Sequence, residues 1–484
     1  MKRTGRANME RSKVIFGNEI SEKVYKKACR KKEKFKKKFG DDSATEYYFK
    51  AEDNPVLAPI GVKNLVLTDE PGFEFPDNAV IVGNIRMGYG HYRISMAIAS
   101  AAHALGYEPY WLDMNGYPET TATKIISYQN DLYSMGSRLS QKISLFNKLY
   151  WEPLNSEGFR KLTYNAADQK CAELMAPLLK NLPKDIPFLA THVWPAQAAI
   201  HAGFERVVNV IPDNWPMALH LAEGAIHTVQ TPSSFLGYKM LRGMDKKREL
   251  KPMPDGSLFY TGHYIDAEFY SNIEVDCAAR LERLERGEPM RFLLSIGGAG
   301  AQQKLFEDII KHIVPYVREG RASLLVNVGD HADVWESISS HVPGLKDGIT
   351  LHINDYNAAK EAIEKESFNG VHVFSDKDIF SAVYTTNLLI RKCDVLLTKP
   401  SELAFYPVPK IMIHRVGGHE AWGAIRAAEV GDGTYEMDKT EEVLSMIDAL
   451  LSDGEILTSL CWCIEDEMEK YSGAYRAVQL AVNK

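Results

Sequence analysis

The stretch that decides the fold runs from Cys393 to Thr434 and reads CDVLLTKPSELAFYPVPKIMIHRVGGHEAWGAIRAAEVGDGT. Its first six residues form a short apolar run with β-branched content, which is typical of a strand buried on both faces of a parallel sheet. The run ends at Lys399, and the Pro and Ser that follow are signals for the start of a helix. A second apolar strand, VPKIMI, leads to a glycine pair and another predicted helix. We therefore expect two loops to meet in one crevice.

The residues of this crevice suit a phosphorylated ligand. Doubly wound sheets bind phosphates at the carboxyl edge of their strands, where helix N-termini point at the ligand. Lys399 is placed to neutralise a phosphate there, and Glu402 to accept hydrogen bonds from a pair of sugar hydroxyls.

A second glycine loop lies between Ala79 and Met114, in the order strand AVIVGN, loop MGYGHYRIS, helix and strand EPYWLDM. This is a βαβ unit, but its loop lacks the G-x-G-x-x-G spacing of a dinucleotide site. His91 falls at the helix N-terminus, where the helix dipole disfavours the protonated ring. It would be neutral near pH 7, as a general base must be. The alternative is that His91 only caps the loop or contacts phosphate.

Three further strands, FLATH, VVNVIPD and TVQTP, end in polar residues and place His192, Asp213 and Asn214 on the edge that carries His91. Asp213 is a second candidate base or a group that orients His91; the alternative is a buried structural aspartate. Later in the chain, MRFLLSIGGAG predicts another strand and glycine loop that open a second domain.

The totals indicate an ordinary globular protein of two domains. Of its residues, 45% are hydrophobic and 25% are charged. Its length of 484 residues exceeds what one hydrophobic core usually holds. Its six cysteines form no CxxC pair and lie near no histidine cluster, so neither a disulfide framework nor a zinc site is indicated. No apolar run reaches the roughly 18 residues of a membrane span, and the N-terminus lacks a signal-peptide core. We expect a reducing, cytoplasmic location.

Charge is unevenly distributed along the chain. The net charge is −7, yet residues 1–40 hold 15 basic and four acidic residues. The acidic remainder argues against a nucleic-acid binder. On a helix, one side of the basic segment collects Ile20, Val24, Ala28, Phe35 and Phe39. This pattern suits a helix on an anionic membrane surface, and so a peripheral place on the inner face of the membrane. The alternative is that these apolar residues pack on the body of the protein.

The order strand, K-P, S-E, short helix, apolar strand, G-[QH]-E, helix, G-x-G resembles the donor-binding half of GT-B glycosyltransferases. The resemblance is to the group containing the peptidoglycan transferase MurG and the diacylglycerol galactosyl- and glucosyltransferases. MGYGHYRIS is similar to the group's G-G-G-H loop, with Tyr89 in place of a glycine, and TGHYIDAEFY is similar to its exit from the first domain. The glycine pair that the group has after K-P is absent here, and Gly423 and Ala424 stand where it has an asparagine.

The resemblance implies an α/β fold of two doubly wound Rossmann-like domains that face each other across a cleft, with a basic N-terminal helical extension. The implied divisions are the extension and connector (1–70), the acceptor-side domain (71–275), the nucleotide-sugar domain (289–454) and a C-terminal helix that crosses back to the first domain (455–484).

The implied activity is a metal-independent hexosyltransferase, which moves a sugar from a nucleoside diphosphate donor, expected to be a UDP-sugar, to a hydroxyl acceptor with inversion. Glycolipid synthesis is one expected setting, with a lipid or a glycan as acceptor, and no cofactor is needed beyond the nucleotide sugar. His91 and Asp213 are the catalytic candidates, and Glu402 is the implied ligand of the ribose diol. The implied donor-binding set is Gly297, Gly298, Gly300, Gln302, Lys399, Ser401, Glu402, Gly418, His419 and Glu420. The implied acceptor-side set is Gly88, Tyr89, Gly90, His192 and Asn214.

Three other functions stay open on the sequence. A catalytically degenerate GT-B domain would bind a nucleotide or a partner without turnover. A nucleotide-sugar 2-epimerase would need more acidic and basic groups around the sugar. The basic segment could also make the chain a membrane-docked scaffold. The aromatic helical region 115–183 corresponds to the acceptor-facing helices of the lipid-transferring relatives, or else forms core.

Overall fold

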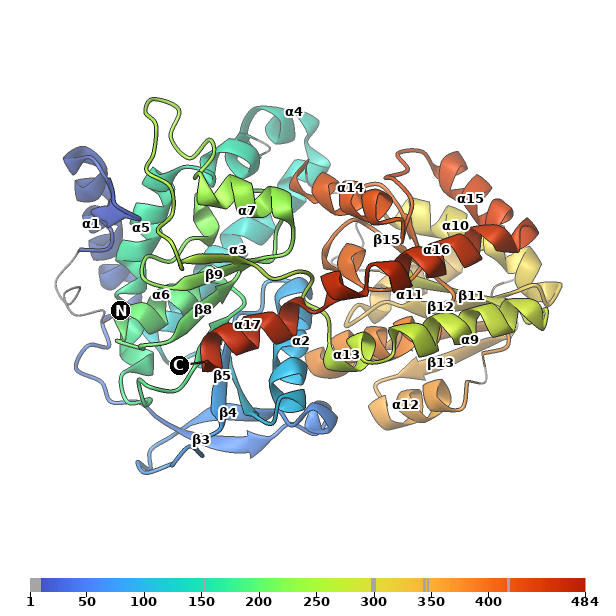
Figure 1. Ribbon diagram of the computed structural model, residues 1–484, viewed down its shortest axis with the longest axis horizontal. Helices are drawn as coiled ribbons and strands as arrows, with labels where there is room; N and C mark the ends of the chain where they lie inside the picture. The colour runs from blue at the N-terminus through green and yellow to red at the C-terminus, as the bar shows by residue number, and fades with distance from the viewer. Residues whose placement is uncertain are drawn as a thin grey trace.

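The computed structural model describes residues 10–151, 153–296, 302–342, 345, 348–366, 368–415 and 418–483. Two domains lie side by side, each built on its own sheet (Figure 1). The first sheet has the strand order β10-β9-β8-β7-β5-β6-β4-β3, and the second has the order β13-β14-β12-β11-β15-β16. All pairs in the second sheet are parallel. In the first sheet, only the pair of β3 and β4 is antiparallel among the described strands.

The strands of the first sheet are β3 (Tyr48–Asp53), β4 (Lys63–Thr68), β5 (Ala79–Asn84), β6 (Glu108–Asp113), β7 (Phe188–Ala190), β8 (Val207–Val210), β9 (Ile226–Val229) and β10 (Leu258–Tyr260). The strands of the second sheet are β11 (Met290–Ser295), β12 (Ala322–Asn327), β13 (Ile349–Ile353), β14 (Val371–Ser375), β15 (Val395–Thr398) and β16 (Lys410–Met412). A separate hairpin pairs β1 (Val14–Ile15) with β2 (Asn18–Glu19).

The helices of the first part of the chain are α1 (Glu22–Phe39), α2 (Gly90–Ala104), α3 (Thr121–Lys142), α4 (Ser144–Phe146), α5 (Leu162–Ala172), α6 (Val193–His201), α7 (Pro232–Lys239), α8 (Ala267–Tyr270) and α9 (Ile273–Glu285). Those of the second part are α10 (Gln303–Arg318), α11 (Ala332–His341), α12 (Tyr356–Glu364), α13 (Ile379–Ile390), α14 (Ala421–Val430), α15 (Thr440–Ser452), α16 (Gly454–Asp466) and α17 (Gly473–Val482).

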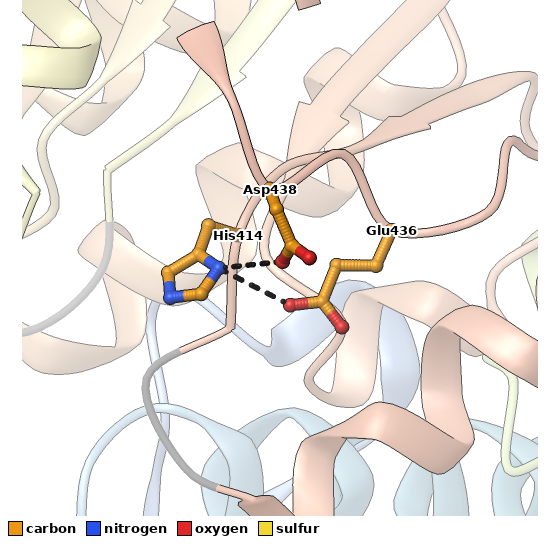
Figure 2. Close-up of side chains that lie close together, drawn as sticks. All are labelled: His414, Glu436 and Asp438. Atoms are coloured by element: carbon orange, nitrogen blue, oxygen red, sulfur yellow. Dashed lines mark hydrogen bonds and ion pairs between the residues drawn. The ribbon is translucent and has the colours of Figure 1, made fainter. Parts of the chain in front are cut away.

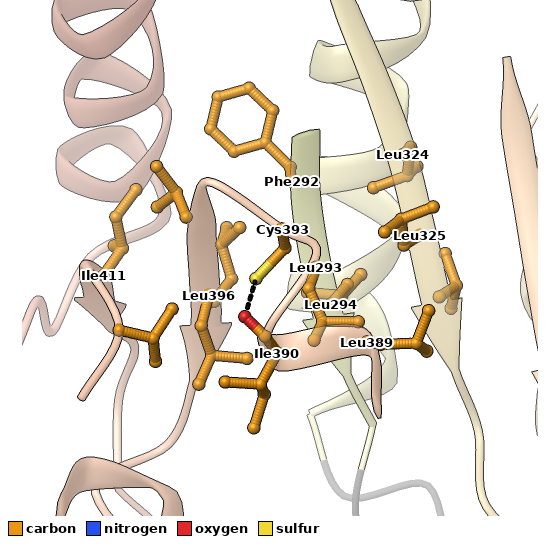
Figure 3. Packing of buried hydrophobic residues seen from close by; sticks show 14 of the residues in the cluster. Phe292, Leu293, Leu294, Leu324, Leu325, Leu389, Ile390, Cys393, Leu396 and Ile411 are labelled. Carbon is orange, nitrogen blue, oxygen red and sulfur yellow. Dashed lines mark hydrogen bonds between the residues drawn. The ribbon is translucent and has the colours of Figure 1, made fainter. Parts of the chain in front are cut away.

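The central strands are buried because helices cover both faces of each sheet. Every residue of β5 is buried, as its unbroken apolar sequence predicts. In the second domain, leucines of β11 and β12 pack against Leu396 of β15 and Ile411 of β16 (Figure 3). Strand β11 lies between β12 and β15, and its consecutive residues Phe292, Leu293 and Leu294 are all buried, so both faces of the sheet are covered there. The predicted fold class, two Rossmann-like domains that face each other, is confirmed.

The polar sequence of residues 41–78, interrupted by Pro and Gly, predicts a connecting segment with one short strand at GVKNLVL, and the structure differs from this at the edge of the first sheet. Two strands are present, and β3 pairs with β4 antiparallel, from Tyr48 opposite Thr68 to Asp53 opposite Lys63. The sequence YFKAED has no apolar alternation because this edge strand is mostly exposed. A pattern based on burial therefore misses it.

The short helix expected after Lys399 and Pro400 is present as a single turn. Residues Glu402–Phe405 form a single 3₁₀ turn, η6. The prolines at 407 and 409 explain the stop, because a proline disfavours helical backbone in the residue before it. The chain therefore turns at once into β16, and Glu402 stays at the strand edge.

The basic helix α1 packs on α5 of the first domain. Ala28 and Phe35 are buried there, and Phe35 lies edge-on to Phe39 and Tyr128. Lys31 pairs with Asp168 at 3.1 Å and Lys32 with Glu173 at 2.6 Å. The body of the protein thus covers the apolar side of α1, which leaves mainly lysines exposed.

The end of the chain returns to the first domain. Helix α17 packs on α2, β7 and β8 (Figure 1). Among the described residues, no helix combines the length and the apolar content that crossing a membrane requires.

One glycine of β5 sets the fit between two central strands. A Cβ at Gly83 would lie 2.5 Å from the ring of Phe188 on β7. We expect Gly83→Ala to lower the free energy of unfolding by about 1–3 kcal/mol, because the ring has to move in a packed core. Denaturant unfolding measures this change. Gly158→Ala is the control, since the nearest atom to its added Cβ is the flexible end of Leu154. Equal stability of the two variants would contradict the packing argument.

Candidate functional site

The two sheets turn their topological switch points toward one cleft. In the first sheet the chain passes from β5 to β6 on one side and to β7 on the other. In the second it passes from β11 to β12 and, later, to β15 on the opposite side. Such points open a crevice at the carboxyl ends of the strands, where ligands bind in doubly wound folds. The loops after β5, β7 and β15, together with the first turn of α2, carry eight of the 17 predicted site residues. Gly297, Gly298 and Gly300, in the loop after β11, lie outside the described residues.

His91, in the first turn of α2, is held by the neighbouring strand. Its Nδ1 lies 2.7 Å from the carbonyl oxygen of Thr191. A carbonyl oxygen only accepts, so Nδ1 carries the proton and Nε2 of the neutral ring keeps its lone pair. Burial lowers the pKa of His91, which outweighs both the Thr191 bond and the charge of Asp213. The ring is therefore a neutral proton acceptor at pH 7.

A second histidine stands against the first. The ring of His192 lies edge-on to His91, with centroids 4.9 Å apart. Its Nδ1 accepts from the backbone N–H of Trp194 at 3.2 Å and so caps α6. Burial, followed by the nearby His91, holds the pKa of His192 well below its ordinary value. A neutral His192 leaves His91 without a charged neighbour at this position.

Asp213 pairs with a histidine that the sequence analysis missed. His220 Nε2 lies 3.1 Å from Asp213 Oδ2, and His220 Nδ1 lies 2.6 Å from the hydroxyl of Tyr238. The only sequence signal for His220 was its position, a polar residue seven positions after Asp213 in a segment without a clear apolar pattern. Asn214 is buried beside this pair, and its side-chain oxygen has no hydrogen-bond partner among the described residues.

Lys399 and Glu402 reach the cleft from the end of β15. Lys399 pairs with Glu420, the residue before α14. Burial opposes the charge of Lys399, but the carboxylates of Glu420 and Glu402 outweigh it and raise its pKa. Lys399 is thus a permanent cation at the switch point of the second domain. Ser401 donates its backbone N–H to the carbonyl oxygen of Lys399 at 2.8 Å, which closes the turn.

Glu402 points across the cleft at the start of α2. Its Oε2 lies 3.2 Å from where a Cβ on Gly90 would stand, so a side chain at that position would require the carboxylate to shift by a few tenths of an ångström. Its Oε1 lies 3.7 Å from Nε of Arg93, a second site residue that the sequence analysis missed. Arg93 is buried and also donates to the side chain of Asn387 in the second domain. This guanidinium therefore links α2 with both η6 and α13.

Tyr89 takes part in a further link between the domains. Its hydroxyl donates to the carboxylate of Asp330 and accepts from the backbone N–H of Asp330 at 2.9 Å. Arg86 binds the same carboxylate at 2.7 Å. Gly88, which precedes Tyr89, has φ +71° and so turns the loop toward the second domain. A tyrosine in place of the glycine of the resembled loop thus gives this chain a direct contact across the cleft.

The exit of β16 holds the one group of described residues that brings three possible metal-ligand side chains together. His414 Nδ1 lies 2.9 Å from Asp438 Oδ1 and 3.4 Å from Glu436 Oε1 (Figure 2). Arg415 also binds Glu436. A guanidinium already balances this carboxylate, so the group fits an ion-pair network that holds the loop. Gln302 donates to the carbonyl oxygen of His414 at 2.5 Å, which ties the start of α10 to this loop.

The loop then leads to the remaining predicted donor residues. Gly418 is exposed and Glu420 half-buried, both in the short helix η7 (Gly418–Glu420). His419 lies between them, and its side chain is outside what the structure describes. Burial, followed by the charges of Asp213 and Glu420, raises the pKa of Tyr133 of α3 to about 12. Acids and bases from both domains thus converge around one space.

Residues 14–240 match a family described as a domain of unknown function (DUF6937), and residues 253–482 match another (DUF6938). No curated protein matches the sequence.

Several solved structures resemble the chain at low identity. A UDP-GlcNAc 2-epimerase from Neisseria meningitidis bound to UDP-GlcNAc is 11% identical, with 84% of this chain and 98% of that chain covered and a TM-score of 0.45. A glycosyltransferase from Rickettsia africae is 11% identical, with 84% of this chain and 100% of that chain covered and a TM-score of 0.42. An α,α-trehalose 6-phosphate synthase from Burkholderia multivorans is 12% identical, with 84% of this chain and 96% of that chain covered and a TM-score of 0.39. These matches assign no role to any residue of this chain.

Proposed function

We propose that this chain is a glycosyltransferase of the hexosyltransferase type that moves a sugar from a UDP-sugar to a hydroxyl acceptor with inversion. One observation carries the proposal: the switch points of the two sheets present opposite chemistry to a single cleft. The second domain offers the cation Lys399 and the carboxylate Glu402, and the first offers the neutral base His91.

The donor fits the second domain on chemical grounds. Lys399 is placed to neutralise the diphosphate, and the N-terminal N–H groups of α10 and α2 would add positive potential. Glu402 would accept hydrogen bonds from the two ribose hydroxyls, as implied by the family resemblance. We propose that these groups stabilise the departing diphosphate without a metal ion.

His91 is the proposed general base. Its Nε2 lone pair would take the proton of the acceptor hydroxyl as the oxygen attacks the anomeric carbon, and the bond from that carbon to the diphosphate would break. Attack on the face opposite the leaving group inverts that carbon. The Thr191 carbonyl fixes the ring and would stabilise the imidazolium that forms.

A thermal-shift panel of UDP, GDP, ADP and several UDP-sugars, with and without magnesium, tests the donor class. A ligand at 100 times its Kd adds about 2.7 kcal/mol of stability and so raises Tm. We expect a shift with UDP and its sugars that does not depend on magnesium, followed by release of UDP when an acceptor is added. The absence of any nucleotide shift would reject the donor assignment and favour a degenerate GT-B domain.

A nucleotide-sugar 2-epimerase is the second candidate, because the cleft holds more titratable groups than transfer requires. His91, His192, Asp213 and His220 all lie near one another in the first domain. Epimerisation at C2 breaks and remakes a C–H bond, whereas transfer leaves that bond intact. Incubation with UDP-GlcNAc in D₂O would therefore place deuterium at C2 only if the chain is an epimerase. NMR separates the two outcomes.

We propose a lipid as the acceptor, on the evidence of an apolar rim beside the cleft. Leu145 and Leu149 are 67% and 68% exposed. Leu236 on α7 is 63% exposed, and Ile425 on α14 is 48% exposed. Helices α4, α7 and α14 lie along one rim of the molecule (Figure 1). Trp215, close to α7, stacks on Trp422 of α14 across the cleft, with centroids 5.7 Å apart. Such patches commonly mark interaction sites.

A double variant tests the lipid assignment. We expect Leu145→Ser with Leu149→Ser to reduce binding to lipid vesicles by about 10- to 100-fold, because each leucine loses part of the 1.5–3 kcal/mol gained on burial. Vesicle sedimentation measures this, and UDP binding should be unchanged. Leu351→Ser, at an exposed leucine of β13, is the control. If both proteins bind vesicles as the parent does, the rim is not a lipid surface.

The basic helix α1 supports a separate contact with anionic lipid, and so the peripheral location predicted from the sequence. Lys34 and Lys37 are exposed, although the apolar side of the helix is covered. We expect Lys34→Glu with Lys37→Glu to weaken binding to anionic vesicles by roughly tenfold or more, since each basic residue near such a surface contributes about 1 kcal/mol. Binding to neutral vesicles is the control and should not change. Unaltered binding to anionic vesicles would show that α1 does not contribute to membrane contact.

A further inference from the structure

A cavity of about 360 Å³ lies at the edge of the first sheet, apart from the cleft. Leu65 of β4, Trp111 and Asp113 of β6, and Tyr92 of α2 line it, together with Phe380 of α13. Its volume is within the range of small-molecule sites.

The cavity exists because two neighbouring parallel strands separate. Strands β4 and β6 pair only at Lys63 with Tyr110 and at Asn64 with Trp111. Both strands continue beyond these pairs, β4 to Thr68 and β6 to Asp113. The hydroxyl of Tyr117 donates to the carbonyl oxygen of Leu65 at 2.8 Å and so satisfies one backbone group of the split. The opening is thus part of the folded sheet.

Consecutive residues of α2 keep this cavity separate from the proposed active site. His91 turns to Thr191 at the switch point. Tyr92 turns to β6, where its hydroxyl donates to Asp113. Neighbouring residues of a helix point about 100° apart, so His91 and Tyr92 face different sides of α2. A ligand in the cavity would not occupy the place of the sugar donor.

Three aromatic rings form one side of the cavity. The centroid of Trp111 lies 5.1 Å from that of Tyr92 and 5.3 Å from that of Phe380, at interplanar angles of 71° and 68°. The Tyr92 and Phe380 centroids are 5.5 Å apart. The electron-rich faces of such rings attract organic cations. Phe380 comes from the second domain, so the wall is complete only when the domains are together.

The polar groups of the cavity are acidic. Asp113 and Glu119 line it, and its lining contains no lysine, arginine or histidine among the described residues. Burial raises the pKa of Asp113, although Tyr92 and the N–H of Asn115 donate to it. The buried Nε1 of Trp111 has no hydrogen-bond partner among the described residues. The charge of Arg86 acts on Asp113 from outside the lining and burial outweighs it, so the described lining itself offers no cation to either carboxylate.

We propose that this cavity binds a small organic ammonium ion, with the cationic head between the carboxylates of Asp113 and Glu119 and its alkyl groups against the wall of Tyr92, Trp111 and Phe380. The site is independent of the proposed transferase activity, because it shares no lining residue with the donor or acceptor groups assigned above.

Choline and its uncharged isostere 3,3-dimethylbutan-1-ol provide a matched pair of probes for the full chain. Calorimetric titration should give saturable 1:1 binding of choline, with the isostere much weaker. Glu119→Gln should weaken choline binding by about twofold to fivefold, as for an exposed ion pair. Phe380→Leu should weaken it by about 2- to 30-fold through loss of one ring face. Glu336→Gln, an exposed acid on α11, should have no effect.

Equal binding of the two probes would show an apolar pocket without selectivity for charge. Binding of glucose as strongly as choline would make the cavity a carbohydrate site. Absence of saturable binding at millimolar choline, or choline binding that neither Glu119→Gln nor Phe380→Leu alters, would overturn the proposal. Glu119 is exposed, so Glu119→Gln should fold as the parent does, and a change in its choline binding can be attributed to the lost charge.

Discussion

Replacing His91 with glutamine is expected to lower the rate of sugar transfer by about 10²- to 10⁴-fold, the usual contribution of a general base. Glutamine keeps a hydrogen-bonding side chain of similar length but cannot take up a proton. The affinity for UDP should change little, because the side chain of His91 makes none of the assigned donor contacts. Turnover with saturating donor, and UDP binding by calorimetry, would measure the two quantities separately.

The pH dependence provides a second readout of His91. Burial lowers its pKa, so the neutral base persists below the ordinary histidine value of about 6.5. Activity of the parent protein should therefore hold as pH falls from 8 through that value and be lost only lower. His103→Gln is the matched control, on an exposed residue near the end of the same helix. A variant as active as the parent would reject His91, and a loss in Asp213→Asn or His220→Gln instead would move the base to that pair.

Replacing Glu402 with alanine is expected to weaken the binding of UDP and UDP-sugars by about 10²- to 10⁴-fold. Hydrogen bonds to a charged group contribute about 1.5–3 kcal/mol each, and the proposed ribose contact makes two of them. Binding by calorimetry measures the loss. A donor analogue that lacks both ribose hydroxyls should bind parent and variant alike, since it cannot make these bonds.

Glu402 also faces Arg93, so its loss has a structural consequence that must be separated from binding. Arg93 is buried, and its Nε has no hydrogen-bond partner among the described residues besides the ion pair with Glu402 at 3.7 Å. Glu402→Gln keeps the shape of the side chain and removes only the charge, and its Tm reports the structural part. Glu429→Gln, exposed on α14, is the control. Unchanged UDP binding in Glu402→Ala would show that the donor site is elsewhere.

The central strands could be predicted from the sequence because a buried strand has a local run of apolar residues. AVIVGN and VLLT are unbroken apolar runs, and they became β5 and β15, each next to a switch point. The exposed edge strand β3 escaped because its side chains meet water and follow no apolar pattern. Local composition likewise could not decide what covers the apolar side of α1, since lipid and α5 are equally suitable partners for it.

The site divides in the same way. Glycine loops, strand ends and helix starts placed His91, Asp213, Lys399 and Glu402 at carboxyl edges, because these features depend on nearby residues. Arg93 and His220 were missed, since their partners decide their roles. Arg93 meets Asn387 across 294 positions of sequence.

The sequence by itself determined the buried parallel strands and the strand edges that carry the polar loops, because apolar periodicity and glycine positions act over short distances along the chain. Only the tertiary structure decided that Glu402 faces α2, that Tyr89 binds Asp330 and that β4 parts from β6 to leave an acidic aromatic cavity. These features arise from packing one domain on the other and one strand beside the next. The contacts involved join residues far apart in the sequence, so no local pattern records them.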